Sequence, residues 1–505
     1  MRSTGFSICL TFGIALSSAQ PGFDQTIEID SATTPLTTSK DVVAASAPVA
    51  YVYVGTAKGV NLYDAASNGQ LTLVKGSPFH TSGLAIGSNG SSFISLGTYD
   101  VHSYSVSSTG TIGKQVSSIN TQDYPDNGVC DGQPFGTIGL ANLDHTGKNL
   151  YVLFPNDNGD CNEAIQTYNI SKSGDLSFNG GIMTGSNAGY GFYQAPTIIE
   201  NDTFGYLAGD FDCCGGGPGW AGFVRESNGE MQNLAFNLSG GNTYPVGYDP
   251  FYVTADSTNH LAAIVANNYG PEEYDPAQLA SYTVDSKGNL SSTATAKNMP
   301  YPEVTDAYTL NMSPEGNLLA VGGYGLQVFH FNGAAPITPY SKVLTSAAIT
   351  EMHWDNNNHL YALSAAQSYS TLSYSASGAT NVTIKGSDGS SYPLGDCSGE
   401  CSGEQNVTPK ATTTYTISGT KVGGGKASAA AKVTVISKPT AKGDNPTSNA
   451  SSESPLSISA FPTSITTYSR LFVYTVTPTT ITETPGSPYT LSGPGVNALI
   501  VVPKL

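Results

Sequence analysis

Positive charge is scarce in this sequence. Lys and Arg number 20 against 38 Asp and Glu, which gives a net charge of −18. Beyond the extreme N-terminus the only arginines are Arg225 and Arg470. Binding to nucleic acid or to an anionic membrane surface needs clustered Lys and Arg. The composition therefore predicts a protein that does not bind nucleic acid.

Long apolar runs and helical periodicity are also missing. No run is long enough to span a bilayer, and no stretch combines apolar residues at a 3.6-residue spacing with helix caps. Instead the chain holds 57 Gly, 29 Pro and 29 Tyr beside 11% charged residues. Such a composition favours strands and turns over helices. We therefore expect an all-β protein without a membrane span.

The N-terminus has the pattern of a signal peptide. Arg2 precedes the apolar run 8–16, and Ser17-Ser18-Ala19 forms a small-residue cleavage site. We predict a signal peptide over 1–19 and a flexible Ser/Thr/Pro leader over 20–49, with a buried strand as the alternative. The mature protein is then secreted and extracellular, or held at the cell surface.

Cysteine is sparse, and its number is informative. Of seven cysteines Cys9 belongs to the signal peptide, and the remaining six form an even set that favours disulfides in an exported chain. Adjacent cysteines either form a vicinal ring or bond to two different partners, so the connectivity stays open. The pairs that we predict are Cys130–Cys161, Cys213–Cys214 and Cys397–Cys401.

A unit of apolar strand, polar turn and second apolar strand recurs along the chain. Clear copies occupy 84–96 and 140–152, and a further strand pair follows each copy. Equivalent second-strand positions recur at intervals of roughly 50 residues: Phe93, Tyr151, Tyr206, Leu261, Leu318 and Tyr361. Four short strands at that period are typical of one β-propeller blade.

A seventh unit is split between the chain ends. Residues 50–55 read as a second strand without a first, and 496–502 as a first strand with nothing after it. Joining them would close a ring and remove exposed sheet edges. We therefore predict a seven-bladed propeller, over 50–366 and 470–505, in which the C-terminal strand completes the first blade.

A gap-free match shows where the seventh blade is interrupted. Residues 60–79 align with 470–489, and both end in Gly-Ser-Pro followed by an aromatic residue. Both segments are then third and fourth strands of a blade. Because the preceding second strand lies near 360–363, residues 367–469 are an insertion between two adjacent strands of blade 7.

The insert alternates apolar and small polar residues, as sandwich strands do. It resembles bacterial immunoglobulin-like surface modules through Thr371-Leu-Ser-Tyr374, Val407-Thr-Pro409 and Thr412-Thr-Thr-Tyr415, with Tyr374 in place of the usual tryptophan. The strand over 456–466, first in those modules, comes last here, after the linker 437–455. We expect a circularly permuted sandwich, which puts its two ends side by side. The alternative is an ordinary sandwich followed by a disordered tail.

Propeller geometry assigns the connections to two ends of the blades. Loops between first and second, and third and fourth strands, are short turns such as 144–147 and 285–288. The other connections are long, and the insertion belongs to the same set: 120–135, 155–163, 209–219, 267–276 and 298–306. Long loops on one end of a rigid scaffold are the usual place for binding.

The propeller also resembles a known family. The strand Tyr51-Val-Tyr-Val54, the unit over 144–152 and the ending over 71–79 look like lactonase-type seven-bladed propellers, relatives of 6-phosphogluconolactonase and carboxymuconate cyclase. That resemblance implies Arg and His in a central funnel for anionic sugar acids. Neither Arg225 nor Arg470 is clearly on the funnel wall, and the seven histidines lack metal-type spacing.

Acidic and aromatic residues gather in the long loops. Asp157, Asp160, Asp210 and Asp212 could hold Ca²⁺, although Asn, Asp and Gly are also ordinary turn residues. Exposed aromatics there could stack on sugars or contact a protein, or could pack the loops. The candidate ligand-binding residues are Asp157, Asp160, Asp210, Asp212, Trp220, Tyr248, Tyr269 and Glu272.

Three functions remain open from the sequence. We favour a monomeric binding or adhesion protein for an extracellular glycan or protein, without catalysis. A lactonase-like hydrolase working in the funnel on a sugar lactone or sugar acid is the alternative. A largely structural envelope protein is the third.

Overall fold

The structure is a computed structural model. It describes residues 47–81, 84–123, 140–154, 164–183, 191–192, 196–199, 203–210, 219–234, 248–267, 276–292, 298–365, 367–409, 413–421, 424–433, 456–477, 479–492, 496 and 498–504. Residues 1–46, with the expected signal peptide and most of the leader, lie outside this set, as does the linker 437–455. Within the described residues no helix is long and apolar enough to cross a bilayer.

The chain folds into antiparallel sheets of about four strands each, which we number as blades 1 to 5 in chain order. One short 3-10 helix, η1 (Thr121–Asp123), follows blade 2. Blade 1 consists of β33 (Ala498–Pro503), β1 (Ala50–Thr56), β2 (Gly59–Ala65) and β3 (Leu71–Leu73), and blade 2 of β4 (Leu84–Ser88), β5 (Ser92–Leu96), β6 (Asp100–Val106) and β7 (Ile112–Asn120). Blade 3 consists of β8 (Leu140–Leu143), β9 (Asn149–Phe154), β10 (Ala164–Ile170) and β11 (Leu176–Met183), and blade 4 of β12 (Gly191–Phe192), β13 (Thr197–Ile198), β14 (Phe204–Asp210), β15 (Gly219–Arg225) and β16 (Met231–Asn233). Blade 5 consists of β17 (Tyr248–Ala255), β18 (His260–Asn267), β19 (Gln278–Val284) and β20 (Leu290–Ser291).

A larger sheet contains two further four-strand sets, blades 6 and 7. In blade 6 the connection between the second and third strands is so tight that both form one strand, β22. In blade 7 the third strand is the C-terminal part of β30. Blade 6 consists of β21 (Thr305–Met312), β22 (Leu318–His330) and β23 (Thr338–Pro339). Blade 7 consists of β24 (Thr345–Trp354), β25 (His359–Ser364), β30 (Leu456–Val476) and β31 (Ile481–Glu483), and β32 (Tyr489–Ser492) also pairs with β30.

Packing between the blades closes them into a ring. Each of seven buried clusters joins one blade to the next, and one of them joins blade 7 to blade 1 through Tyr361 and Val52. The first strands of neighbouring blades also contact one another, from β33 to β4 and from β17 through β21 and β24 back to β33. The fold is therefore a β-propeller with its first strands innermost.

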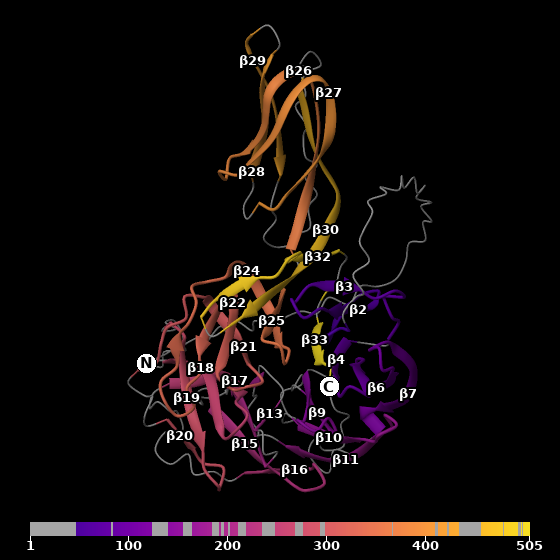
Figure 1. The fold of residues 1–505 in the computed structure, drawn as a ribbon, viewed down its shortest axis with the longest axis vertical. Coiled ribbons are helices and arrows are strands. Elements are labelled where there is room, and N and C mark those ends of the chain that lie inside the picture. Colours follow the sequence, from indigo (N-terminus) through magenta and orange to yellow (C-terminus); the bar gives the residue numbers. More distant parts are fainter. Residues whose placement is uncertain are drawn as a thin grey trace, which may run out of the picture. The chain divides into compact units, whose positions relative to one another are not determined.

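The C-terminal strand completes the first blade, as the sequence predicts. Strand β33 pairs with β1 from Ala50 opposite Pro503 to Gly55 opposite Ala498. Figure 1 shows this strand, yellow, among the indigo strands of the N-terminal part. A chain end thus supplies the strand that removes the inner edge of blade 1.

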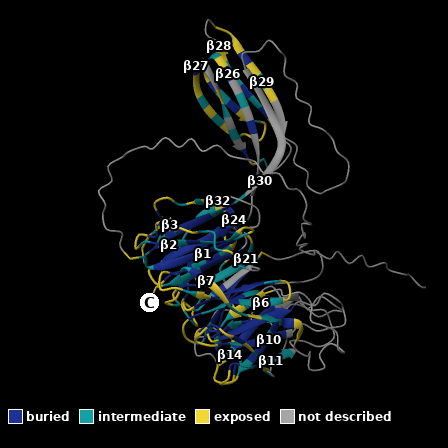
Figure 2. Cartoon of the chain, turned by 90° about the vertical axis from the view of Figure 1, so that its right-hand side faces the viewer, coloured by how far each residue is buried: buried dark blue, intermediate teal, exposed yellow. Residues whose placement is uncertain are grey.

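The second strands of the blades are buried almost without interruption, as β1, β5, β9 and β25 show. They are flanked by a strand on each side and covered on both faces by neighbouring blades. A strand buried on both faces reads as a continuous apolar run, which is why Tyr51-Val-Tyr-Val54 shows no alternation. Figure 2 shows β1 in dark blue.

The aligned segments 60–79 and 470–489 adopt the same structure. Ser77 Oγ accepts a hydrogen bond from the Leu62 amide at 3.1 Å, and Ser487 Oγ accepts one from the Val473 amide at 2.9 Å. Both Ser-Pro peptide bonds are cis. The match therefore identified equivalent strands of blades 1 and 7.

Residues 367–469 form a set of strands with a core of its own. Its strands are β26 (Gln367–Gly386), β27 (Ser391–Val407), β28 (Thr413–Lys421), β29 (Lys426–Val433) and the N-terminal part of β30. Leu372, Val382, Ile384 and Tyr415 belong to a buried cluster separate from those of the blades. The segment 456–466 is not a tail, because Leu456 to Phe461 pair with Ala376 to Thr371 of β26.

The two ends of this segment are side by side. Gln367 lies opposite Tyr468 in the antiparallel ladder, and the Arg470 amide donates to Ser364 Oγ at 2.8 Å. Strand β30 then continues into blade 7, where Leu471 lies opposite Leu363. This close approach is what an insertion between adjacent strands requires.

Two details differ from the expectation. The first strand of blade 4 is split into the short strands β12 and β13, each paired with β14. In blade 6 the second and third strands are continuous through Tyr324 and Gly325, whose φ is 137°. A glycine tolerates this backbone conformation, so the chain turns there without a separate loop.

Replacing 367–469 with a short Gly-Ser linker should leave a folded propeller, because the core of the insert is separate and its ends are already adjacent. We expect cooperative thermal unfolding close to that of the full chain, followed by circular dichroism. A control deletion of 367–476 also removes the third strand of blade 7 and should not fold. An insoluble 367–469 deletion would contradict this placement of the insert.

Candidate functional site at the long-loop end of the blades

The two ends of the blades are built differently. We call the end with the first-to-second and third-to-fourth connections the turn end, and the opposite one the long-loop end. At the turn end, second-strand tyrosines donate to glycine carbonyls of the next blade: Tyr53 to Gly110 at 2.6 Å, Tyr151 to Gly229 at 2.9 Å and Tyr206 to Gly288 at 2.8 Å. These contacts fix neighbouring blades to one another.

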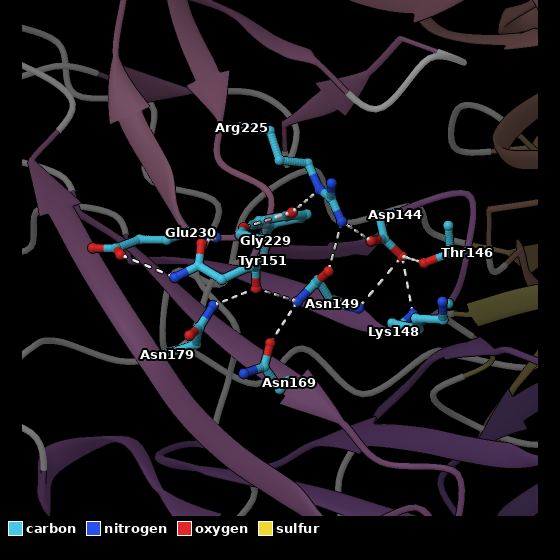
Figure 3. A network of polar contacts seen from close by, with 12 residues as sticks. Asp144, Thr146, Lys148, Asn149, Tyr151, Asn169, Asn179, Arg225, Gly229 and Glu230 are labelled. Carbon is cyan, nitrogen blue, oxygen red and sulfur yellow. Dashed lines mark hydrogen bonds and ion pairs between the residues drawn. The ribbon is translucent and has the colours of Figure 1, made fainter.

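Arg225 belongs to this turn-end network. Its guanidinium contacts the Asp144 carboxylate at 2.6 Å, Asn149 Oδ1 at 2.7 Å and the Tyr151 hydroxyl at 2.8 Å, as Figure 3 shows. Burial lowers the pKa of Arg225, but Tyr151 and Asp144 outweigh that effect and raise it. Its donors bind neighbouring blades, so Arg225 serves structure and offers no anion clamp.

Arg470 is also held locally. Its guanidinium lies over the Tyr468 ring, with Cζ 5.4 Å from the ring centroid, and Nη2 is 3.4 Å from the Tyr468 hydroxyl. Both residues are at the junction of blade 7 with the insert. The two arginines therefore do not converge on one site.

The long-loop end carries exposed apolar side chains. Six large hydrophobic residues are exposed among the described residues, and five of them lie at this end. Only Leu73 is elsewhere, on the outer strand of blade 1. The five are Tyr99, Leu140, Tyr301, Tyr324 and Val343. Of these five, the two tyrosines Tyr301 and Tyr324 are much the most exposed, and contiguous exposed apolar groups mark a surface for binding.

Three of these residues belong to blade 6 or to the connections on either side of it: Tyr301, Tyr324 and Val343. Tyr301 and Tyr324 are the most exposed, at 58% and 59%. A Cβ on Gly325, next to Tyr324, would lie 3.2 Å from Val343 Cγ1, so the hairpin of β22 touches the connection to blade 7. We call Tyr301, Asp306, Tyr308, Tyr324 and Val343 the blade 6 patch.

The innermost strands of blades 7 and 1 bring together a carboxylate and an imidazole. Glu351 and His353 of β24 lie two residues apart, hence on one side of the strand. The Leu499 amide of β33 donates to Glu351 Oε2. Burial raises the pKa of Glu351 to about 7, which the Leu499 bond opposes. Burial lowers the pKa of His353 to about 4, against a backbone hydrogen bond with Leu499.

Opposite pH effects on stability follow from these two pKa values. The Glu351 contribution is present below 4.5 and is lost as the pH rises through about 7. The His353 contribution is present above 6.5 and is lost as the pH falls through about 4. Between pH 4.5 and 6.5 the two contributions change the free energy of unfolding with pH in opposite directions, so they cancel in the wild-type protein.

Glu351→Gln should therefore make stability fall on acidification below pH 6.5, by about 1 kcal/mol per pH unit relative to wild type. His353→Gln should give the opposite slope, with stability falling as the pH rises from 4.5 to 7. Urea midpoints measured across this window test both signs. If the urea midpoints of both variants and of the wild type change with pH in parallel, the pKa values of Glu351 and His353 are not shifted in this way.

The structure places some of the predicted site residues. Trp220 is a correction to the expected binding surface: it is 6% exposed and packs between Tyr206 and Tyr282, with ring centroids 6.4 and 5.0 Å away. Tyr248 is partly buried against the same core of blades 4 and 5. Asp210 ends β14. The remaining predicted residues lie outside the described residues: Asp157, Asp160, Asp212, Tyr269 and Glu272.

The predicted calcium site and disulfides are placed only in small part. No three His, Cys, Asp or Glu side chains gather as a metal site in the part of the chain that the structure describes. Cys397 is disulfide-bonded, and Cys401 lies on the same strand, so a bond between them stays a prediction. The other predicted disulfide cysteines lie outside the described residues: Cys130, Cys161, Cys213 and Cys214.

Several residues of the site were missed from the sequence. The loop 298–306 was recognised, but Tyr301 and Asp306 within it were not, nor were Tyr308, Tyr324, Glu351 or His353. In β24 the signal was present: Met352 and Trp354 are apolar, and the intervening positions are charged or polar. A first strand with polar residues on one side is what the inner wall of a propeller predicts.

Comparisons with known proteins found only distant structural similarity. No family model matches the chain, and no curated protein matches it. A crystal structure described as a candidate 6-phosphogluconolactonase of Bacteroides uniformis is 12% identical, with a TM-score of 0.36, covering 59% of this chain and 97% of that one. A similar protein of Bacteroides fragilis is 13% identical, with a TM-score of 0.33, covering 61% and 98%.

A third structure, the β-propeller domain of Myceliophteria thermophila Cps50, is 8% identical, with a TM-score of 0.36, covering 71% of this chain and 99% of that one. The strand pairings and the buried clusters between the blades define the fold of this chain.

Proposed function

We propose that this chain is an extracellular binding or adhesion protein, which binds a glycan or a protein with the long-loop end of a seven-bladed propeller. The observation that carries the proposal is the distribution of exposed large hydrophobic residues: of the six among the described residues, five are at that end. At the turn end, in contrast, the tyrosines, Arg225 and the buried aspartates make hydrogen bonds within a blade or between neighbouring blades. The predicted signal peptide 1–19 supports export of the protein, and the aspartates of the long loops support binding of Ca²⁺.

The insert fits this proposal as a second module of the same surface. We propose an immunoglobulin-like sandwich over 367–469, opened between its first two strands. The pairing of Leu456–Phe461 with β26 supports this proposal. In an unpermuted module the strand over 456–466 would come first and β26 second, and the two are neighbours here although the first now follows at the end of the segment. The insert occupies a second-to-third strand connection, the class of loop that opens at the long-loop end.

A lactonase-like hydrolase is the second candidate, and one specific observation favours it. A carboxyl group with a pKa of about 7 can both donate and accept a proton at neutral pH, and Glu351 stands beside His353 on an innermost strand. Both groups, however, form hydrogen bonds with the backbone of Leu499. Their presence is therefore also explained by a structural role, which is to hold β33 against β24.

One pair of assays separates the two functions. The full-length protein is screened on an array of glycans, and in parallel against a panel of sugar lactones with and without Ca²⁺. Binding without turnover supports the proposal. Lactone turnover that Glu351→Gln abolishes, while the variant stays folded, would replace it with the hydrolase.

A further inference from the structure

The blade 6 patch presents its tyrosines from a fixed backbone. The Pro300 carbonyl accepts the Leu279 amide at 3.0 Å, and the Glu303 amide donates to Gln327 Oε1 at 2.8 Å. These bonds hold the loop on both sides of Tyr301. A ligand that stacks on this tyrosine therefore does not have to order the loop that carries it, and a tyrosine side chain has few rotatable bonds to immobilise.

The hairpin that carries Tyr324 is equally constrained. Tyr324 lies opposite Thr305 in the ladder, so its neighbour Asp306 is close by. A Cβ on Gly323 would stand 2.4 Å from the Asp306 carbonyl oxygen, so only glycine fits there. Tyr308 lies in the same group, since burial, then Tyr324 and then Asp306, raise its pKa.

The charge at the patch is negative. Glu303 and Lys342 neutralise each other, with Nζ 2.7 Å from Oε1. Asp306 is exposed, and its carboxylate has no hydrogen bond or ion pair within the described residues. The whole chain carries −18. Exposed aromatic faces beside a free carboxylate attract a cation and repel an anion.

We infer that the blade 6 patch binds a saccharide carrying protonated amino groups, of the glucosamine-oligomer class. The sugar ring stacks on Tyr301 and Tyr324, and an ammonium group contacts the Asp306 carboxylate and the tyrosine faces. This inference rests on the proposed binding function and names its ligand class. It excludes the anionic sugar acids, because the patch has no uncompensated cation among its described residues.

The test is calorimetric titration of the full-length protein with glucosamine oligomers, their N-acetylated counterparts and gluconate, at low and high salt. Glucosamine oligomers should bind, and the N-acetylated forms should bind about tenfold more weakly because the charge is gone. High salt should weaken the binding of glucosamine oligomers. Gluconate should not bind.

Three substitutions locate the binding. Asp306→Asn should weaken it about tenfold and remove most of the salt dependence. Tyr324→Ala should weaken it by a similar factor, and Tyr324→Phe should restore it. Leu73→Ala is the control, because Leu73 is an exposed apolar side chain on the outer strand of blade 1, away from the long-loop end, and its loss should leave the affinity unchanged. Unchanged affinity in Asp306→Asn and Tyr324→Ala, or no binding by the wild type, would overturn the inference.

Failure of this inference is distinguishable from failure of the proposed function. If glucosamine oligomers do not bind but an array ligand does, and its binding is lost on changing Tyr99 or Leu140, the proposed function stands and this ligand class is wrong. If no ligand binds at the long-loop end, the proposed function fails as well.

Discussion

A chain that stops after Gly495 should lose its cooperative unfolding transition. The truncation removes β33, with the buried side chains Leu499 and Ile500, and exposes the edge of β1. Burial of two such side chains alone contributes about 3–6 kcal/mol, a large part of the ~5–15 kcal/mol that stabilises a typical domain. The Leu499 amide that holds Glu351 is lost as well. Thermal unfolding followed by circular dichroism measures the result.

A chain that stops after Pro503 is the matched control. It keeps all six residue pairs between β33 and β1 and should unfold within about 0.5 kcal/mol of the full chain. A chain ending at Gly495 that unfolds cooperatively at the wild-type midpoint would show that the ring does not need the C-terminal strand.

Asp355→Ala should cost about 3–5 kcal/mol of unfolding free energy, because it leaves buried partners unpaired. Asp355 is fully buried, and its carboxylate accepts from His359 Nδ1 at 2.7 Å and from the Tyr361 hydroxyl at 3.0 Å. Burial acts to raise the pKa of Asp355, but the hydrogen bonds and charge of His359 outweigh it and lower the pKa. Its stabilisation is therefore present above pH 3.8 and lost as the pH falls through the lowered value. Urea unfolding at neutral pH gives the magnitude.

Two other turns supply a graded control. Asp256 makes a similar contact with His260 Nδ1, at 2.9 Å, from a side chain that is 7% exposed. Asp285 accepts the Lys287 and Asn289 amides at 2.8 and 2.9 Å, in an exposed turn. The loss on substitution by alanine should decrease from Asp355 to Asp256 to Asp285. Equal losses at the three positions would mean that only the turn, and not the buried partners, is stabilised.

The repeat could be read from the sequence because each blade uses the same local chemistry. Second strands buried on both faces read as apolar runs, and turns with Asp or Asn before a glycine read as hairpins. The match of 60–79 with 470–489 located the interruption because both segments make the same Ser to amide bond. What local chemistry could not predict was the fusion of two strands in β22, where the chain turns at Gly325, whose φ is 137°.

The candidate site was predicted less well, because exposure is a tertiary property. Trp220 looked like a loop aromatic, yet it begins a third strand whose neighbours cover it. Tyr324 was not singled out from the sequence, yet it stands at a hairpin and is exposed. The short connections between first and second strands were expected to be simple turns, but in the one at Asp355 the buried carboxylate binds His359 and Tyr361. In each case the exposure of the side chain depends on how strands pack, within a blade or against the next one.

A glycan array probed with three forms of the full-length protein tests the central claim most directly, namely that the long-loop end binds and the turn end does not. The forms are the wild type, Tyr301→Ser with Tyr324→Ser at the long-loop end, and Lys172→Ala with Lys287→Ala in exposed turns of the turn end. We expect the wild-type signals to disappear in the tyrosine variant and to persist in the lysine variant. Signals that persist in the tyrosine variant and disappear in the lysine variant, or an array with no signal for the wild type, would contradict it.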